Sequence, residues 1–211
     1  HLFEYSFYQA NYNQFDSSAI LETQTAMPDR NADKEALAYL EKTMKEFDSA
    51  GGVMECVVKN VPAGIGDTVF EKLDANLAKA LMSIGAVKAV EIGDGIKVAS
   101  AKGSTNNDAF SNENGTISKL TNHSGGILGG MSDGSPIVLR AYVKPTPSIY
   151  ATQQTVNKNM ENIDINIKGR HDPIIVPRAV VVMESMVAIT LLDSMMVNMS
   201  AKIDSLEKFY K

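Results

Sequence analysis

The sequence predicts an α+β protein that ends in a long, buried helix. Segments with apolar residues at helical spacing stand beside short runs rich in β-branched residues. From Pro177 the sequence predicts one helix to the C-terminus, and the stretch from Ala179 to Leu192 is almost wholly apolar. A helix that is apolar all round is buried all round, so we expect this stretch in the core.

Composition and charge narrow the class of protein. The 211 residues are 44% apolar and 21% charged, as in an ordinary soluble protein, and we expect one domain over residues 1–211. The formal net charge of −5 offers no basic surface to nucleic acid or anionic lipid. No apolar run reaches the length expected of a membrane span, and the N-terminus lacks a signal-peptide pattern.

Cysteine usage is sparse. Cys56 is the only cysteine, which excludes an internal disulfide framework and a zinc cluster built from cysteines. It lies in a run that predicts a strand, so a buried structural thiol is the expected role. These features suit a reducing compartment, and we expect a cytoplasmic protein.

The first part of the chain predicts a lead-in followed by a helix. Residues 1–33 are expected to be an ordered lead-in, and four aromatic residues fall within residues 1–8 without an initiator methionine. So dense an apolar start needs a surface to pack on, and we expect a longer protein cut before His1. Asp33 is expected to cap a helix that ends before Gly51. Its apolar positions are Leu37, Leu40, Met44 and Phe47.

Residues 53–92 predict a strand–helix–strand unit. Strands are expected at 53–58 and 87–92, and Asp67 is expected to cap the helix between them. The apolar face of that helix is predicted at Phe70, Leu73, Leu77, Ala80 and Leu81.

The next segment begins with a turn. Gly93-Asp94-Gly95 between two apolar runs predicts a hairpin into a strand at 96–100. Residues 102–123 are rich in Gly, Ser, Thr, Asn and Asp and are expected to form a long, mobile polar loop.

A glycine-rich stretch follows at residues 124–134. It has the composition of a phosphate-binding loop, but no Gly-Lys-Ser/Thr follows it, and it precedes a strand rather than a helix. Composition alone favours a tight structural turn, and Asp133 argues against an anion bound directly there. The strand after it is predicted at 136–143 from its alternating apolar residues.

Residues 144–148 combine one lysine with two hydroxyl groups on a backbone that two prolines stiffen. Such a set of donors is suited to a phosphate monoester. The alternative is the end of an edge strand with a solvated lysine. A further strand is expected at 163–167.

The stretch Gly169–Pro173 places Arg170, His171 and Asp172 in consecutive positions. Glycine and proline at its ends predict a bend. Such a bend can bind an anion and transfer a proton, or it can be a solvated loop. The histidines His1, His123 and His171 do not have metal-ligand spacing, so we expect no metal site.

Four segments together resemble the C-terminal part of the chorismate synthase family, over about residues 34–195. They are Ala86–Gly95, Asn122–Gly134, Lys144–Ile149 and Gly169–Pro173, and they occur in the family's order and spacing. The resemblance implies an α+β sandwich with helices packed between sheets, assembled as a homotetramer. It also implies the conversion of 5-enolpyruvylshikimate 3-phosphate to chorismate and phosphate, with reduced FMN and no net redox change.

The resemblance implies a set of site residues. Asp172 is expected near the flavin N5, where it assists proton transfer, and Arg170 is expected beside it. The FMN contacts are expected from Gly85, Ala86, Gly129, Lys144, Pro145, Thr146, Pro147, Ser148 and Arg170.

The sequence also departs from the family. A Gly-Ser-His-Gly type motif and an Arg-Ser-Ser/Ala type motif, which carry the family's catalytic histidines and most substrate-binding arginines, do not occur in these residues. Gly85, Ala89, Asp133 and Ile174 replace the family's usual residues, and Asp133 places a negative charge near the cofactor loop. The alternative function is a non-catalytic flavin- or phosphate-binding module, or an oligomerisation module.

Overall fold

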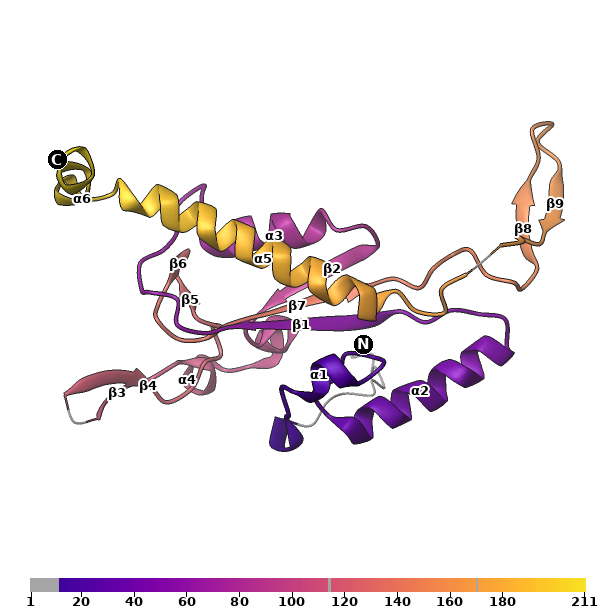
Figure 1. Ribbon diagram of the computed structural model, residues 1–211, viewed down its shortest axis with the longest axis horizontal. Coiled ribbons are helices and arrows are strands. Elements are labelled where there is room, and N and C mark those ends of the chain that lie inside the picture. The colour runs from indigo at the N-terminus through magenta and orange to yellow at the C-terminus, as the bar shows by residue number, and fades with distance from the viewer. Residues whose placement is uncertain (1–11, 114, 170) are drawn as a thin grey trace. The chain divides into compact units, whose positions relative to one another are not determined.

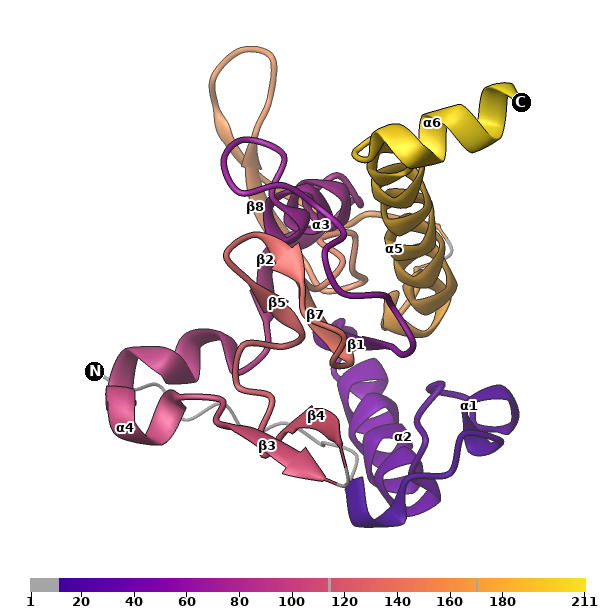
Figure 2. The same ribbon diagram turned by 90° about the vertical axis from the view of Figure 1, so that its left-hand side faces the viewer.

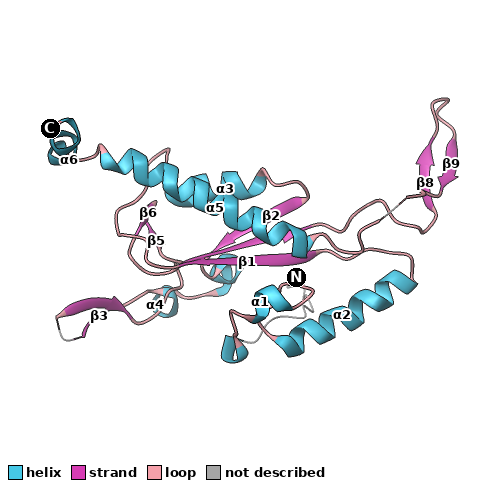
Figure 3. Ribbon diagram, in the orientation of Figure 1, coloured by secondary structure: helices cyan, strands magenta, loops and turns pink. Residues whose placement is uncertain are grey.

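A computed structural model describes residues 12–113, 115–169 and 171–211 of the chain (Figures 1 and 3). Contacts between residues divide the chain into two compact units. The first unit is His1–Val53 with Val143–Val180, and the second is Met54–Tyr142 with Val181–Lys211. The expectation of a single domain with a lead-in at 1–33 stays a prediction, and residues 1–11 of that lead-in lie outside the described residues.

The first unit begins with helical segments: η1 (Tyr12–Gln14), α1 (Ala19–Glu22) and α2 (Arg30–Lys45). The cap of α2 is Asp29, whose carboxylate accepts hydrogen bonds from the backbone N–H groups of Asn31 and Ala32. The expected cap at Asp33 is therefore wrong. The Asp33 carboxylate is buried and instead accepts hydrogen bonds from the backbone N and the hydroxyl of Thr25, at 3.1 and 2.6 Å.

The buried face of α2 also differs from the prediction. Leu40 is buried as expected, but Met44 and Phe47 are 55% and 62% exposed. The helix instead buries small residues, Ala32 and Ala36, beside Leu40 and Thr43.

A β-hairpin of β8 (Gln153–Val156) and β9 (Asn162–Ile165) completes the strands of the first unit. The two strands are antiparallel, and Thr155 lies opposite Ile163. The strand predicted at 163–167 is confirmed as β9, although β9 begins one residue earlier and ends at Ile165.

A three-stranded sheet forms the centre of the second unit, with the order β1-β7-β2. Its strands are β1 (Gly52–Val58), β7 (Ile137–Val143) and β2 (Val87–Ile92), and a few end residues of β1 and β7 belong to the first unit. In β7 the side chains alternate between buried and half-buried, with Ile137, Leu139 and Ala141 fully buried. This alternation confirms the predicted strand.

Two helices of the second unit cover one side of this sheet: α3 (Leu73–Met82) and the part of α5 (Val176–Met199) from Val181 onward (Figures 1 and 2). Leu73, Leu77 and Leu81 of α3 are fully buried, at the spacing of one helix face. From α5, Met183, Val187 and Leu191 are buried at the same spacing. The α+β class with a long C-terminal helix packed on a sheet is thus confirmed.

The prediction that this helix is buried on all sides is wrong for the part of α5 from Val181 onward. Only one face is buried, whereas Val181, Ile189 and Leu192 are 61%, 62% and 59% exposed. The helix also ends at Met199, and a separate helix, α6 (Ile203–Tyr210), follows it. By length and composition alone α5 could cross a membrane, so the expectation that no apolar run is long enough was also wrong. One face of α5 packs on the sheet, and 17% of its apolar 18-residue window is buried.

Three local predictions in the second unit are wrong. Asp67 does not cap α3, which begins six residues later, and Phe70 is 88% exposed. No hairpin follows β2. The chain instead forms a 3₁₀ helix, η2 (Gly95–Ser100), where the Glu91 carboxylate accepts a hydrogen bond from the Ile96 backbone N–H at 3.2 Å.

Residues 102–123 are more regular than expected. They contain α4 (Gly103–Asn106) and an antiparallel hairpin of β3 (Phe110–Glu113) and β4 (Thr116–Lys119). The Asn114-Gly115 dipeptide in the printed sequence is a strong hairpin signal that the polar composition concealed. The mobility of this segment stays a prediction.

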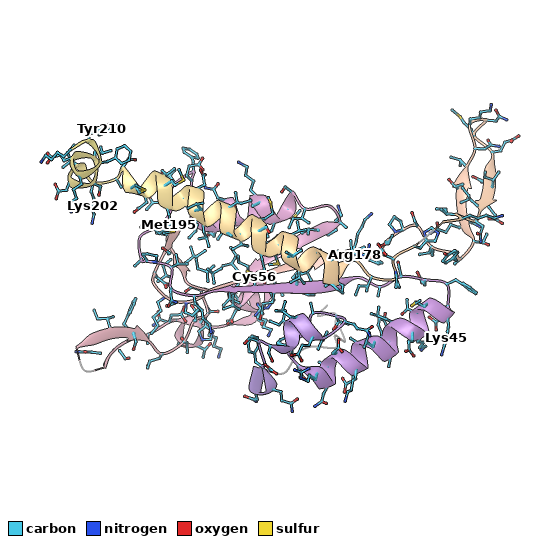
Figure 4. The ribbon with its side chains drawn as sticks, viewed as in Figure 1. Lys45, Cys56, Arg178, Met195, Lys202 and Tyr210 are labelled. Atoms are coloured by element: carbon cyan, nitrogen blue, oxygen red, sulfur yellow. The ribbon has the colours of Figure 1, made fainter. Side chains whose placement is uncertain are left out.

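Cys56 lies on β1, where it is half-buried (Figure 4). Burial, together with the nearby carboxylates of Glu184 and Glu55, raises the pKa of its thiol to about 11. The thiol is therefore protonated at neutral pH and is a poor nucleophile, which agrees with a structural role.

Candidate active site

The first unit brings together two segments that the sequence singled out separately. A small cavity of about 70 Å³ is lined by Ser148 from the segment 144–148 and by His171 and Asp172 from the bend 169–173. Asp48 and Tyr150 also line it. A hydroxyl group, an imidazole and carboxylates thus share one hollow, although 23 residues separate Ser148 from His171 in the sequence.

The backbone after α2 connects these two segments. The Ser49 hydroxyl donates a hydrogen bond to the carbonyl oxygen of Thr146 at 2.6 Å, and the Ala50 N–H donates one to the carbonyl of Pro173 at 2.8 Å. Gly51 comes so close to the strand end that a Cβ atom there would lie 2.7 Å from the Val143 carbonyl oxygen. A glycine is therefore required at position 51 for the segments to meet.

Residues 144–148 present an exposed cation and a hydroxyl group without a partner. Lys144 is exposed, and among the described residues none forms an ion pair with it. The Thr146 hydroxyl oxygen is buried and has no hydrogen-bond partner in the described part of the chain. A buried hydroxyl without a partner is costly, which makes Thr146 a candidate for a binding role. An ammonium and a hydroxyl group fit a phosphate monoester.

The bend 169–173 is held by Tyr150. The Tyr150 hydroxyl donates a hydrogen bond to the Gly169 carbonyl at 2.6 Å, and its ring meets that of His171 edge-on with centroids 4.5 Å apart. The Nε2 atom of His171 lies 3.0 Å from the carbonyl oxygen of Ile167. This contact requires a proton on Nε2, which leaves Nδ1 as the acceptor in the neutral ring.

Asp172 has an ion-pair partner. Its Oδ2 lies 2.9 Å from Nη1 of Arg178, which is near the start of α5 (Figure 4). The side chains are 33% and 66% exposed, respectively. An exposed pair of this kind contributes about 0–1 kcal/mol to stability, so it does not by itself explain a carboxylate at this position. Arg170, the other expected catalytic residue, lies outside the described residues.

The glycine-rich stretch is a hairpin in the second unit, formed by β5 (Ile127–Leu128) and β6 (Met131–Ser132). Gly129 lies in its turn with a φ of 61°, and a Cβ atom there would meet nothing within 4 Å. The composition-based prediction of a tight turn is therefore confirmed, and the turn leaves Gly129 open to a ligand. Asp133, just beyond β6, forms an ion pair with the buried ammonium of Lys119.

The turn after β2 packs against the start of this hairpin. A Cβ atom on Gly93 would lie 2.1 Å from the carbonyl oxygen of His123, so only glycine permits the approach. The Asp94 carboxylate lies 2.6 Å from Nδ1 of His123. Both residues lie in segments that carry the family resemblance, but the sequence does not show that they pair, because they are 29 positions apart.

The remaining expected cofactor residues follow α3 in the second unit. Gly85 is exposed, and Ala86 has a φ of 71°, a left-handed conformation that is unfavourable for residues with a Cβ atom. Strained backbone often occurs at ligand sites, which makes this position a reasonable candidate. Gly85, Ala86 and Gly129 thus belong to one unit, whereas residues 144–148 and Asp172 belong to the other.

Among the described residues, no group of three or more His, Cys, Asp or Glu side chains could hold a metal ion.

Comparisons with known proteins agree with the resemblance. The sequence profile of the chorismate synthase family matches residues 7–196. The chain is 60% identical over 197 residues to a chorismate synthase of Agathobacter rectalis. The aligned region covers 93% of this chain and 54% of the relative. The chain is also 57% identical over 171 residues to a chorismate synthase of Archaeoglobus fulgidus, and that alignment covers 81% of this chain and 48% of the relative.

A solved structure described as the crystal structure of chorismate synthase superimposes with a TM-score of 0.72 at 29% identity, over 92% of this chain and 51% of the other. The chain spans about half the length of the relatives that it matches. Since the family profile covers most of its residues, the chain belongs to the chorismate synthase family.

Proposed function

We propose that this chain is the FMN-binding and proton-transferring part of a chorismate synthase. The enzyme would eliminate phosphate from 5-enolpyruvylshikimate 3-phosphate to give chorismate, a carbon–oxygen lyase reaction. The observation that carries this proposal is the cavity shared by Ser148, His171 and Asp172, and the unpartnered hydroxyl of Thr146 lies in the same segment 144–148. The relatives, all described as chorismate synthases, support it further.

Residues 144–148 would hold the phosphate of FMN. Lys144 provides a charge-assisted hydrogen bond, and the hydroxyl groups of Thr146 and Ser148 provide neutral ones. Pro145 and Pro147 restrict the backbone, so little conformational entropy is lost when the ligand binds. Gly85, Ala86, Gly129 and Arg170 would complete the FMN contacts.

Asp172 would hold and release the proton. Reduced FMN, when bound, would supply a flavin N5 able to take a proton from the substrate, with no net redox change overall. The Asp172 carboxylate, paired with Arg178, would accept the proton already on the flavin and would release it to solvent after the elimination, so that the proton lost by the substrate replaces it at the flavin. Arg170 is the other residue of the bend that is proposed to take part in catalysis.

Two further features belong to the proposal. The full-length protein, by which we mean this chain extended to the length of its relatives, would act as a cytoplasmic homotetramer. Its segment outside these residues would supply the catalytic histidines and most of the arginines that bind the anionic substrate. In the alternative of a non-catalytic flavin- or phosphate-binding module, residues 144–148 would still bind the flavin or the phosphate, but Asp172 would have no chemical role. In the alternative of an oligomerisation module, neither segment would have a ligand.

Lys144→Ala is expected to weaken FMN binding by the full-length protein by about 10–100-fold, because a charge-assisted hydrogen bond contributes about 1.5–3 kcal/mol. Fluorescence titration of the flavin measures the dissociation constant. Lys158→Ala is the matched control, since Lys158 is also exposed in the first unit but lies in the β8–β9 turn. Equal dissociation constants for wild type and Lys144→Ala would mean that Lys144 is only a solvated strand end.

Thr146→Val tests the unpartnered hydroxyl group with an almost isosteric side chain. Removing a buried polar atom that has no partner is expected to leave the melting temperature unchanged or raise it, since its desolvation cost of about 1–3 kcal/mol disappears. FMN affinity is expected to fall by about 5–10-fold, because the variant loses one hydrogen bond that contributes about 1 kcal/mol or slightly more to binding. A stabilised variant that binds FMN as tightly as wild type would show that the hydroxyl has no ligand.

A further inference from the structure

Three buried charged residues, Asp108, Lys119 and Asp133, lie at the base of the glycine-rich hairpin in the second unit. We call them the buried charge triad. Their side chains are 4%, 5% and 10% exposed, respectively. Charged groups are rarely so deeply buried unless they are paired, so these three residues have a specific structural purpose.

Asp108 binds the segment that leads into the hairpin. Its Oδ1 accepts hydrogen bonds from the Thr121 hydroxyl and the His123 backbone N–H, both at 2.7 Å. Its Oδ2 accepts hydrogen bonds from the backbone N–H and the hydroxyl of Ser124, at 2.9 and 2.7 Å. One carboxylate therefore holds the backbone N–H groups of His123 and Ser124, the two residues immediately before Gly125, and the side chain of Thr121.

Asp133 binds the segment that leaves the hairpin. Its Oδ1 accepts a hydrogen bond from the Ser135 backbone N–H at 2.8 Å, and its own N–H donates to the Gly126 carbonyl at 3.0 Å. The entry and exit of the hairpin are thus each attached to one buried carboxylate.

Lys119 connects the two carboxylates. Its Nζ forms the ion pair with Asp133 and lies 4.0 Å from Oδ2 of Asp108, with the Ser124 hydroxyl 3.5 Å away. The ammonium also lies 5.6 Å from the centre of the Phe110 ring. The β3–β4 hairpin, which supplies both Lys119 and Phe110, therefore carries the counter-ion of the glycine-rich hairpin.

The ionisation of both carboxylates agrees with this geometry. Burial raises the pKa of Asp108, but the hydrogen bonds from Ser124, His123 and Thr121 outweigh it, and the pKa lies far below its usual range. Burial likewise raises the pKa of Asp133, and the contacts with Lys119 and Ser135 lower it by more. Both groups are therefore charged at neutral pH, as the ion pairs require.

The triad also explains a departure from the family. Asp133 stands where the family usually has Asn, and its negative charge was expected to disfavour a phosphate-bearing cofactor at this hairpin. Lys119 neutralises that charge within the protein. The hairpin can therefore carry an aspartate whose own charge is paired inside the protein with the Lys119 ammonium.

We infer that Asp108, Lys119 and Asp133 are positioning residues that hold the glycine-rich hairpin in the conformation that presents Gly129 to the cofactor. The inference rests on the proposed function, because the cofactor is FMN only if the protein is a chorismate synthase. The triad does not contact the cofactor in this account; it acts through the backbone of residues 121–135.

The test is a double-mutant cycle in the full-length protein with Lys119→Met, Asp133→Asn and the double variant. Lys119→Met keeps an unbranched side chain that is one atom shorter, but it leaves two buried carboxylates without their cation. We expect faster amide hydrogen exchange in residues 124–134 and FMN binding weakened by about tenfold, since misplacement of a binding group by about 1 Å has effects of this size or larger. The double variant removes the opposite charges together and should recover most of the affinity.

The outcomes separate the inference from the proposed function. Binding is measured well below the melting temperature of each variant, so that loss of stability alone does not change the dissociation constant. Unchanged hydrogen exchange, or unchanged FMN affinity in Lys119→Met when the wild-type protein binds FMN, would overturn the inference only. A double variant that binds FMN no better than Lys119→Met would also overturn it. A wild-type protein that does not bind FMN would overturn the proposed function and, with it, the link from the triad to the cofactor.

Discussion

Replacing Asp172 by asparagine is expected to lower kcat of the full-length protein by about 10²–10⁴-fold, the usual contribution of a general acid or base. Asparagine keeps the shape of the side chain and removes its basicity. The FMN dissociation constant and the melting temperature should change little, because the cavity is small and the residue is one-third exposed. Steady-state kinetics with reduced FMN, together with flavin titration and thermal unfolding, measure all three quantities.

Arg178 provides the control for this experiment. If Asp172 only forms the exposed ion pair with Arg178, removing either partner should have the same small effect. Arg178→Gln removes the pair and leaves the carboxylate in place. We therefore expect Arg178→Gln to retain most of the turnover that Asp172→Asn loses. Near-normal turnover in Asp172→Asn would instead assign Asp172 a structural role, since asparagine replaces aspartate well in caps and turns.

The 211-residue chain, purified alone, is expected to make no detectable chorismate. The motifs that carry the family's catalytic histidines and most substrate-binding arginines do not occur in it. Each missing acid–base group lowers the reaction rate by about 10²–10⁴-fold, and the loss of oriented substrate binding lowers the rate further. Chorismate formation is followed with reduced FMN present, with the full-length protein as the positive control.

The exposed apolar face of α5 gives a physical reason for the same expectation. Val181, Ile189, Leu192 and Val197 are each more than half exposed on one helix. Exposed apolar surface of this extent is characteristic of an interface that another element covers. Turnover by the isolated chain at a rate near that of the full-length protein would contradict this prediction and the assignment of the missing groups.

Several elements could be predicted from the sequence because their signals are local. The strands β1, β2 and β7 and the helix α3 were located from β-branched runs and helical spacing, and burial of alternate residues in β7 confirmed the pattern. The segments 144–148 and 169–173 were selected because each concentrates donors or charges within a few residues. Both then proved to line one cavity.

Other features depend on side-chain hydrogen bonds that patterns of apolar and turn residues do not specify. Asp29 rather than Asp33 caps α2 because Thr25, eight residues before Asp33, binds the Asp33 carboxylate. The turn after β2 becomes a 3₁₀ helix because Glu91 and the carbonyl-binding Arg140 hold it there. No pattern within either segment contains this information.

Local residue patterns were sufficient to predict the family, the main strands and helices, and the residue types available for phosphate binding and proton transfer. Packing of distant segments sets which of these residues meet, which charges are paired and which apolar faces are covered. Asp133 alone indicates a repulsive charge, whereas Asp133 beside Lys119 is a neutral pair. The periodicity of α5 likewise cannot determine its burial, because burial is set by what lies opposite each face, and these partners come from distant parts of the chain.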